Sequence, residues 1–402
     1  MQAIVLAAGE GSRMRPLTLT RPKVMVPVGG GPFLEHLVDR SIQSGVEEFV
    51  FVVGYRSSAV RDHFGDGDRF GVEIDYVVQE EQLGTGHALM AAEDRAQERF
   101  LVLNGDVLTD TLSLKRVLGA GGPAVAAKEV EDPSRYGVLE TEDGLLRSVV
   151  EKSPRPPSNL ANAGIYLFDR TIFGALRGAP ASVRGEFELT DGINGLLSRG
   201  EEVRVVEIED WIELGRPWDV LEANRTLISQ SDRGIQGDVE PGATLSGPVS
   251  VGEGSTIRSG SYIVGPVLIG RGCDIGPNCF IRPHTCIGDG VRVGNAVEIK
   301  NSAIMAGTNV AHLSYVGDSV IGSNCNFGAG TIVANLRHDD AKIRSYIRGE
   351  STDSGRRKLG AIIGDDVKTG INTSIYPGTV IAPGYRGRPG EVLRGHVEQI
   401  RP

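Results

Sequence analysis

The stretch IGRGCDIGPNCFIRPHTCIG, residues 269–288, places an aliphatic residue at every sixth position, often followed by glycine. An α-helix repeats at 3.6 residues and a strand at 2, so neither produces a strict period of six. Stacked short parallel strands joined by turns do, since each step adds one aliphatic side chain to the inner wall of a solenoid. The pattern therefore predicts a parallel β-helix. The positions in phase are Val239, Leu245, Val251, Ile257, Ile263, Ile269, Ile275, Ile281, Ile287, Val293, Ile299 and Met305.

The phase of this repeat changes further along the chain. Ile321, Phe327 and Val333 keep the period of six in a new phase, so we expect a slip between Met305 and Tyr315. Residues 334–359 interrupt the repeat with a polar, basic segment, and after Ile381 the regularity fades. Insertions in a solenoid form loops on one face, which often bind ligands, although such a loop can also be mere decoration. The later phase resumes at Ile363, Thr369, Ile375 and Ile381, and the basic residues of the interruption are Arg337, Lys342, Arg344, Arg348, Arg356, Arg357 and Lys358.

The first half of the chain alternates apolar, strand-like runs with amphipathic, helix-like stretches. This alternation predicts a mostly parallel sheet covered by helices, ending with a helix at 217–229 and a linker at 230–236. The sequence thus predicts two domains, residues 1–230 and 236–402. The expected strands are Ala3–Ala8, Glu48–Val53, Ile74–Val78, Arg99–Leu103, Pro123–Val130 and Ala163–Phe168, and the expected helices include Phe33–Ser44 and Thr85–Ala96.

Composition excludes several classes of protein. A net charge of -10 argues against a nucleic-acid-binding surface, which needs a basic patch. No apolar run reaches the roughly 20 residues that a membrane span requires, and residues 1–8 lack the basic leader of a signal peptide. The four cysteines form no C-x-x-C pair. Cys273, Cys279 and Cys325 each follow an inward aliphatic residue by four positions, where small buried packing residues are expected. A reducing cytoplasm fits this pattern.

Two motifs near the start indicate phosphate chemistry. The run LAAGEGSRMRPLT, residues 6–18, places a glycine-rich loop after the first strand, and RPKVMVP, residues 21–27, follows with a lysine. Glycine-rich loops at the carboxyl edge of a sheet approach phosphates through backbone N–H groups. Together the two motifs resemble the sugar nucleotidylyltransferase family, whose signature is this loop followed by Lys-x-x-x-Pro. The resemblance implies a Rossmann-like mixed sheet, with Arg13 and Lys23 as catalytic cations.

Later motifs extend this resemblance in the same order as in the family. QEEQLGTGHA, residues 79–88, resembles the base-recognition segment of the family. Its sequence is most similar to that of members that use UTP and N-acetylglucosamine-1-phosphate, although dTTP stays an alternative. LVLNGD, residues 101–106, ends a buried strand in a carboxylate, which suits Mg²⁺ binding, with a helix or turn cap as the alternative. The implied nucleotide-binding residues are Leu6, Ala8, Gly9, Gln79, Gly84 and Thr85.

The resemblance also implies sugar and metal sites. Gly137, Glu151 and Asn162 would contact the sugar, and Lys152 would meet its phosphate. Trp211–Asp219 resembles the segment that supplies a second metal ligand, here Glu213, where many members carry Asp or Asn. Asp219 is expected to cap the following helix. The implied reaction is in-line attack of a sugar-1-phosphate oxygen on the α-phosphorus of the nucleotide, driven by positioning and charge neutralisation.

Around the expected slip, a second resemblance appears. Residues 282–335, including EIKNS at 298–302, VAHLSYVGD at 310–318 and IGSNCNFGAGTIVAN at 321–335, match without a gap the acetyltransferase domain of the bifunctional GlmU family. Those enzymes acetylate glucosamine-1-phosphate with acetyl-CoA on a left-handed β-helix and form homotrimers. The resemblance implies His312 as general base, Arg282 and Lys300 as phosphate ligands, Tyr315, Asn326 and Asn335 as orienting residues, and Ala329 along acetyl-CoA. The longer basic insertion resembles archaeal relatives, and galactosamine-1-phosphate stays possible as acceptor.

Three functions follow as alternatives. The leading one is a bifunctional enzyme that acetylates glucosamine-1-phosphate and couples the product to UTP, giving UDP-N-acetylglucosamine. The second is a glucose-1-phosphate uridylyl- or thymidylyltransferase whose β-helix only trimerises the chain. The third is a regulatory subunit without activity, which the joint retention of Arg13, Lys23, Asp106, Glu151 and Lys152 argues against.

Overall fold

The computed structural model describes residues 1–179, 185–231 and 234–398. Two compact units divide the chain: one combines Met1–Glu10 with Phe33–Glu213, and the other combines Gly11–Pro32 with Leu214–Pro402. The expected division near residue 230 therefore differs from these units, because residues 11–32 and 214–230 pack with the C-terminal coils. Residues 232 and 233 of the expected linker lie outside the described part of the chain.

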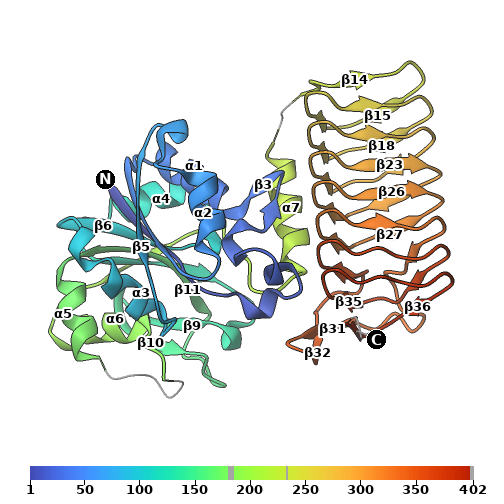
Figure 1. The fold of residues 1–402 in the computed structure, drawn as a ribbon. Helices are drawn as coiled ribbons and strands as arrows, with labels where there is room; N and C mark the ends of the chain where they lie inside the picture. Colours follow the sequence, from blue (N-terminus) through green and yellow to red (C-terminus); the bar gives the residue numbers. More distant parts are fainter. Residues whose placement is uncertain (180–184, 232–233, 399–402) are drawn as a thin grey trace. The chain divides into compact units, whose positions relative to one another are not determined.

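The first unit contains a nine-stranded sheet in the order β5-β4-β1-β6-β11-β8-β12-β10-β9 (Figure 1). Strands β5, β4, β1 and β6 pair in parallel, whereas β11 pairs antiparallel with both β6 and β8. The sheet is therefore mixed, as the family resemblance implied. The mostly parallel sheet expected from the alternation alone is wrong for the second half, where the hairpin β9–β10 was not predicted. The strands are β1 Gln2–Ala7, β4 Glu48–Val53, β5 Glu73–Val78, β6 Arg99–Asn104, β8 Ala124–Glu129, β9 Gly137–Glu142, β10 Leu145–Glu151, β11 Leu160–Asp169 and β12 Arg204–Glu207.

Helices cover both faces of this sheet because its central strands are apolar on both sides. Ile4, Val52 and Val102 share one buried cluster with residues of α3, α5 and α6. On the other face, Phe64 of α2 packs edge-on against Phe51 of β4. The helices are α1 Phe33–Gln43, α2 Ser57–Phe64, α3 Thr85–Ala91, α4 Thr111–Leu118, α5 Thr171–Gly178 and α6 Leu189–Ser198, with α7 Asp219–Ser229 in the second unit.

In the second unit, short strands form three parallel walls, and as far as β30 each strand pairs with the third one before it in the chain (Figure 1). This topology is consistent with the predicted β-helix, with three strands a turn. The first wall comprises β14 Asp238–Val239, β17 Thr256–Ile257, β20 Asp274–Ile275, β23 Arg292–Asn295, β26 Asn309–His312 and β29 Asn326–Phe327. The second comprises β15 Thr244–Ser246, β18 Tyr262–Val264, β21 Phe280–Ile281, β24 Glu298–Lys300, β27 Tyr315–Gly317, β30 Ile332–Val333, β34 Ser374–Ile375 and β36 Val392–Leu393. The third comprises β16 Val249–Val251, β19 Val267–Ile269, β22 Thr285–Ile287, β25 Ala303–Ile304, β28 Val320–Ile321, β33 Ile362–Ile363, β35 Val380–Ile381 and β37 His396–Val397.

From Val251 to Ile299 the inward side chains follow the predicted period, whereas Val239, in the first turn, is 38% exposed. Two corrections apply further along the chain. Ile304, not Met305, pairs with Ile287 and joins the buried core. The first slip therefore lies between Ile299 and Ile304, before the expected place. A second shortening lies between Val316 and Ile321. Both occur in the turns from the second to the third wall, which we call the second corner.

The interruption and the end of the repeat also differ from expectation. Residues 334–359 contain an antiparallel hairpin, β31 Arg344–Ile347 with β32 Glu350–Asp353, inserted at the second corner. The coil then continues to β37, since Ile381 pairs with Val397. The fading pattern after Ile381 is therefore not the end of the coil. Ile375 still pairs with Leu393 at the full spacing, and only the last turn, from Leu393 to Val397, is shorter.

The buried cysteines confirm their expected packing role. Cys273, Cys279 and Cys325 belong to the apolar core of the coil and are free thiols. Burial raises the pKa of the Cys273 and Cys279 thiols, and raises that of Cys325 to about 12. A thiol that stays protonated is a poor nucleophile, so these residues act as small apolar side chains.

Candidate active sites

The glycine-rich loop of the first unit begins where β1 ends at the carboxyl edge of the sheet. The Leu6 carbonyl accepts a hydrogen bond from the Gly105 N–H at 2.9 Å, and the Ala8 carbonyl accepts one from the Tyr55 N–H at 3.0 Å. Gly9 follows as an exposed residue, and a Cβ at this position would meet no atom within 4 Å. The loop thus leaves open space beside a fixed strand end, as a bound nucleotide would require.

The predicted base-recognition segment forms a second side of this edge. The Gln79 side chain, 5% exposed, donates from Nε2 to the Gly84 carbonyl at 3.1 Å. Gly84 has a φ of 108°, and a Cβ there would lie 2.6 Å from the Phe187 carbonyl oxygen, so only glycine fits. Thr85 begins α3, and its Oγ1 accepts the Leu189 N–H at 3.0 Å. These contacts hold the segment in one conformation.

The two predicted metal ligands come from a small antiparallel pair, β7 Val107–Leu108 and β13 Ile212–Glu213. Glu213 pairs with Val107, which directly follows Asp106. This register brings the two carboxylate-bearing residues to neighbouring positions from segments a hundred residues apart. Within the described residues, no group of three or more His, Cys, Asp or Glu is arranged to hold a metal ion. Two carboxylates suit Mg²⁺, which completes its shell with water and phosphate oxygens.

The predicted sugar ligands Gly137 and Glu151 lie opposite one another on the hairpin β9–β10. A Cβ at Gly137 would lie 3.1 Å from Glu151 Oε1, so the glycine leaves the carboxylate free to approach the strand. Glu151 Oε2 is buried and makes no hydrogen bond. A buried acceptor without a partner is costly, and a sugar hydroxyl would satisfy it. Lys152 lies 4.0 Å from the same oxygen.

Asn162 lies on β11 where its register with β8 shifts. Its Nδ2 donates to the Tyr166 hydroxyl at 2.9 Å, and its Oδ1 accepts the Gly164 N–H at 3.1 Å. Burial raises the pKa of Tyr166, and the charges of Glu151 and Asp106 raise it further. Because β11 also pairs with β9 at Ala161 and Val138, Asn162 lies beside the strand that carries Gly137.

Arg13 and Lys23 belong to the second unit, in the segment 11–32. Arg13 is exposed in a short 3-10 helix, Ser12–Met14, and Lys23 begins another, Lys23–Met25. A Cβ at Gly11 would lie 2.7 Å from the Lys23 Cβ, so glycine at this position lets Lys23 approach the start of the segment. The predicted catalytic cations thus share one compact loop.

This loop is anchored to the turns of the coil. Arg21 forms an ion pair with Asp365, and its Nη2 donates to Ser323 Oγ at 3.2 Å. Asp365 also accepts from Thr20 Oγ1 at 2.6 Å. Nearby, the Arg348 guanidinium of the inserted hairpin donates to Ser12 Oγ at 2.6 Å. We call Arg21, Thr20, Asp365 and Ser323 the loop anchor. No local sequence pattern predicts this anchor, because its partners are about 340 residues apart.

At the second corner of the coil, the structure brings together four of the predicted acetyl-site residues. Arg282 Nη1 donates to Glu298 Oε1 at 2.9 Å, and Lys300 Nζ lies 2.8 Å from Asp318 Oδ2. The residues gathered here are Arg282, Lys300, Tyr315 and Asn335, with Asp318 and Asn301, to which the sequence assigned no role.

A hydrogen-bonded network holds this group together. Asn335 Nδ2 donates to the Tyr315 hydroxyl at 3.1 Å and also to Asp318. Burial raises the pKa of Tyr315, and the charge of Asp318 adds to the rise. Tyr315 therefore stays a neutral hydroxyl suited to orienting a substrate.

The other three predicted residues lie at the turns from the first to the second wall, the first corner. His312 ends β26 and is exposed, and its carbonyl accepts from Ser314 Oγ at 2.7 Å. Asn326 begins β29, and Ala329 lies one coil on, next to Gly330, whose N–H reaches the His312 carbonyl at 3.4 Å. The predicted base and the predicted phosphate ligands thus lie at the two edges of the second wall.

One expected role needs correction. Asp219 does not act as the N-cap of α7, because it is the first residue of the helix itself. Its Oδ2 instead accepts the N–H groups of Gly215 and Arg216 at 3.0 and 2.6 Å. Asp219 therefore closes the turn that precedes the helix. No helix of the described residues is long and apolar enough to cross a bilayer.

Comparisons with known proteins cover both units. Residues 2–230 match the family model "Nucleotidyl transferase", and residues 263–386 match "GMPPB C-terminal domain". "Bifunctional protein GlmU" of Methanococcus maripaludis strain S2 is 45% identical over 95% of this chain and 92% of its own length. "Bifunctional sugar-1-phosphate nucleotidylyltransferase/acetyltransferase" of Sulfurisphaera tokodaii is 39% identical over 99% of this chain and 98% of its own length.

Solved structures match the nucleotidyltransferase half. A putative glucose-1-phosphate thymidylyltransferase from Bacillus anthracis is 31% identical, with a TM-score of 0.53, over 56% of this chain and 95% of its own. A UDP-glucose pyrophosphorylase complexed with UDP-glucose is 25% identical, with a TM-score of 0.52, over 57% of this chain and 99% of its own. The chain is therefore a member of the nucleotidyl transferase family and, over nearly its whole length, of the bifunctional GlmU group of sugar-1-phosphate nucleotidylyltransferase/acetyltransferases.

Proposed function

We propose that this chain acetylates glucosamine-1-phosphate with acetyl-CoA and transfers UMP from UTP to the resulting N-acetylglucosamine-1-phosphate. The products are UDP-N-acetylglucosamine and pyrophosphate. The observation that carries the proposal is the likeness to bifunctional relatives over 95% of the chain, which spans both units. The placement of the predicted residues supports it, since most of each set gathers in one region of its unit.

For nucleotidyl transfer, the residues act by binding and orientation. Gln79 and the Gly84 backbone would hold the uracil ring, and Glu151 and Asn162 would hold the sugar hydroxyls. Lys152 would draw in the sugar phosphate, whose oxygen attacks the α-phosphorus in line while pyrophosphate leaves. Arg13 and Lys23 would offset the charge that develops on the leaving group.

Asp106 and Glu213 would hold Mg²⁺ in this reaction. Their neighbouring positions on β7 and β13 and their hard oxygen ligands fit that ion. The longer side chain of Glu213 reaches further than the usual Asp. Mg²⁺ bound there would supply further neutralisation of phosphate charge.

For acetyl transfer, His312 would take a proton from the substrate amine as its nitrogen attacks the thioester carbonyl. The C–S bond then breaks, and the imidazolium would return the proton to the sulfur, so that CoA leaves as the thiol. A neutral imidazole suits this role near pH 7. Arg282 and Lys300 would bind the sugar phosphate, Tyr315, Asn326 and Asn335 would orient the substrate, and Ala329 would lie along acetyl-CoA.

We also propose a cytoplasmic homotrimer built on left-handed coils. Apolar side chains are exposed along the second wall, namely Tyr262 at 47%, Ile332 at 43% and Val392 at 58%. Exposed apolar patches mark interfaces between proteins. A neighbouring copy packed against this wall would complete an acetyl site whose residues lie at both edges of the wall. Native mass spectrometry at three times the chain mass would support this assembly.

Two assays on the same preparation test the proposed activities. Acetyl-CoA with glucosamine-1-phosphate should release thiol, and UTP with N-acetylglucosamine-1-phosphate should release pyrophosphate. The single-activity alternative, a glucose-1-phosphate uridylyl- or thymidylyltransferase, predicts a different pair of results. Pyrophosphate would be released with glucose-1-phosphate and dTTP, and no thiol would be released with glucosamine- or galactosamine-1-phosphate. The two solved relatives cover only the half of the chain that both alternatives share.

A further inference from the structure

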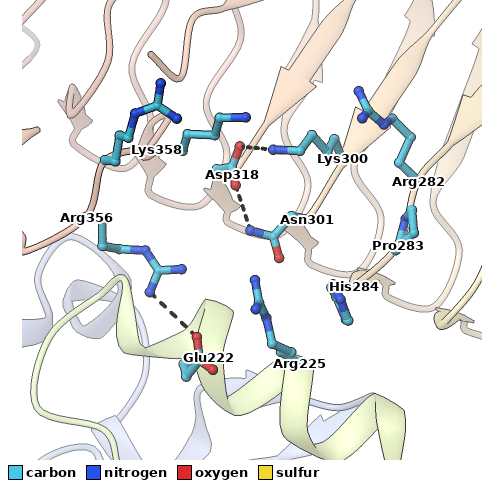
Figure 2. A pocket seen from close by; sticks show the side chains of 11 residues that line it. Glu222, Arg225, Arg282, Pro283, His284, Lys300, Asn301, Asp318, Arg356 and Lys358 are labelled. Carbon is cyan, nitrogen blue, oxygen red and sulfur yellow. Dashed lines mark hydrogen bonds and ion pairs between the residues drawn. The ribbon is translucent and has the colours of Figure 1, made fainter. Parts of the chain in front are cut away.

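The second unit contains a cavity of about 600 Å³ at the second corner of the coil (Figure 2). Three elements line it: the corner turns, helix α7, and residues 356–358 at the end of the insertion. Its size falls within the range of sites that bind small molecules. Arg282 and Lys300, the predicted phosphate ligands, contribute only one part of its wall.

The cavity concentrates positive charge in an acidic chain. Six Lys and Arg side chains line it, beside two carboxylates, although the whole chain carries a net charge of -10. Like charges held together cost free energy, which a bound anion relieves. The six are Arg225, Arg282, Lys300, Arg356, Arg357 and Lys358.

Carboxylates compensate four of the six cations. Lys300 pairs with Asp318, and Arg356 lies 3.9 Å from Glu222. Arg282 and Arg357 pair with Glu298 and Asp340, which do not line the cavity. Neither Arg225 nor Lys358 forms an ion pair with any described residue (1–179, 185–231 and 234–398). Figure 2 shows the Arg225 side chain rising from α7 toward the corner turns. These cations remain available after a single phosphate has bound at Arg282 and Lys300.

A buried polar group in the cavity also lacks a partner. Asn301 is 5% exposed, and its Nδ2 donates to Asp318 Oδ1 at 2.7 Å, which fixes the orientation of the amide. Its Oδ1 is buried without a hydrogen bond, and so is Nδ1 of His284 beside it. A buried acceptor without a hydrogen bond costs free energy. The Asn301 oxygen requires a donor, which a hydroxyl group of a ligand would supply.

We infer that this cavity binds a diphosphate ester of the nucleoside-diphosphate class, with one phosphate at Arg282 and Lys300 and the next at Arg225 and Lys358. A ribose or sugar hydroxyl would donate to Asn301 Oδ1. Guanidinium groups bind phosphate oxygens through paired hydrogen bonds, and two groups of cations suit two linked phosphates better than one singly charged carboxylate. This inference rests on the proposed acetyl site. A bound nucleoside diphosphate would occupy the place of the amino-sugar phosphate. The nucleotide-sugar product, which carries the same diphosphate, would therefore inhibit the acetyl transfer that comes first.

Calorimetric titration of the full-length protein with inorganic pyrophosphate and with inorganic phosphate, in EDTA, tests the binding site. We expect pyrophosphate to bind at least about tenfold more tightly than phosphate, and the double variant R225Q/K358Q to lose this preference. R337Q is the matched control, because Arg337 belongs to the same insertion but pairs with Asp339 outside the cavity. Any binding at the nucleotide site is common to all three proteins, so their difference reports the cavity.

Wild-type affinity for pyrophosphate in R225Q/K358Q, or equal affinity of the wild type for phosphate and pyrophosphate, would overturn the inference. Thermal melts by circular dichroism establish that the variants are folded. In the acetyl-transfer assay, UDP should raise the apparent KM for glucosamine-1-phosphate in the wild type and in R337Q but not in R225Q/K358Q. An equal rise of this KM in all three proteins would overturn the claim of regulation. If the wild type releases no thiol, the proposed acetyl transfer fails, while the titrations still decide the binding site.

Discussion

Replacing Arg21 by alanine should free the loop that carries Arg13 and Lys23. Arg21 is 17% exposed and its partner Asp365 is 9% exposed, so the ion pair is largely removed from water. Asp365 accepts hydrogen bonds from Thr20 Oγ1 at 2.6 Å and from the Ser323 N–H at 2.8 Å as well. Arg21→Ala removes the only full positive charge in this loop anchor and leaves the carboxylate with neutral donors.

The magnitude follows from the burial of the pair. Removing one partner of a buried ion pair costs about 3–5 kcal/mol, because the remaining charge stays desolvated. Thr20 and Ser323 still solvate Asp365, so the lower end, about 3 kcal/mol, applies. That corresponds to an increase of about a hundredfold in the population of the detached loop. Local opening of this kind does not require unfolding of the coil.

Hydrogen-exchange mass spectrometry measures this opening directly. Peptides within residues 12–26 of Arg21→Ala should exchange about a hundredfold faster, whereas core peptides around Ile281 and Ile299 should not change. The double variant with Asp365→Ala should cost less than the sum of the two single variants, since they remove one interaction. Unchanged exchange of residues 12–26 in Arg21→Ala would refute the reasoning.

Three further predictions concern other parts of the chain. Gly84→Ala should raise the apparent KM for UTP at least about tenfold, because its Cβ would lie 2.6 Å from the Phe187 carbonyl oxygen. Gly144 also has a positive φ, but a Cβ there would meet no atom within 4 Å, so Gly144→Ala should leave this KM unchanged. Equal effects of the two substitutions would argue against the steric cause. Asp106→Asn should lower pyrophosphate release about a hundredfold and leave thiol release intact; loss of both activities would indicate misfolding instead. The raised pKa of Cys325, about 12, keeps this thiol protonated at pH 8, so the folded protein should react with a disulfide reagent only on unfolding, and a rapid reaction of the native protein would contradict that burial.

Periodic features were predictable from the sequence because local physics sets them. The period of six predicted the inward residues from Val251 to Ile299, since every strand of the coil repeats the same local environment. The slip was misplaced because Met305 is apolar and buried, but it lies beside the core, where its sulfur accepts from Arg21. Apolar character alone cannot tell Ile304 from Met305.

Features that depend on distant partners were not predictable. The hairpin β9–β10 is an exception, because its Asp143–Gly144 turn, with φ of 51° and 77°, is a local hairpin signal that the expectation of a parallel sheet missed. Asn301 and Arg225 have no motif, and they acquire a role only when α7 and the corner turns line one cavity. The loop anchor likewise needs residues 21 and 365 to meet. The family motifs named Asp106 and Glu213 together, and the pairing of β13 with β7 brings them to neighbouring positions, because a family pattern already contains such long-range information. Their role as metal ligands stays a prediction.

Formation of UDP-N-acetylglucosamine from glucosamine-1-phosphate, acetyl-CoA and UTP in one reaction tests the central claim most directly. Mass spectrometry should detect the acetylated nucleotide sugar with the wild type and with a mixture of the Asp106→Ala and His312→Ala variants. Either variant alone should fail at its own step, Asp106→Ala accumulating N-acetylglucosamine-1-phosphate. A nucleotide sugar without the acetyl group as the only product, or full activity of His312→Ala, would contradict the account of two active sites in one chain.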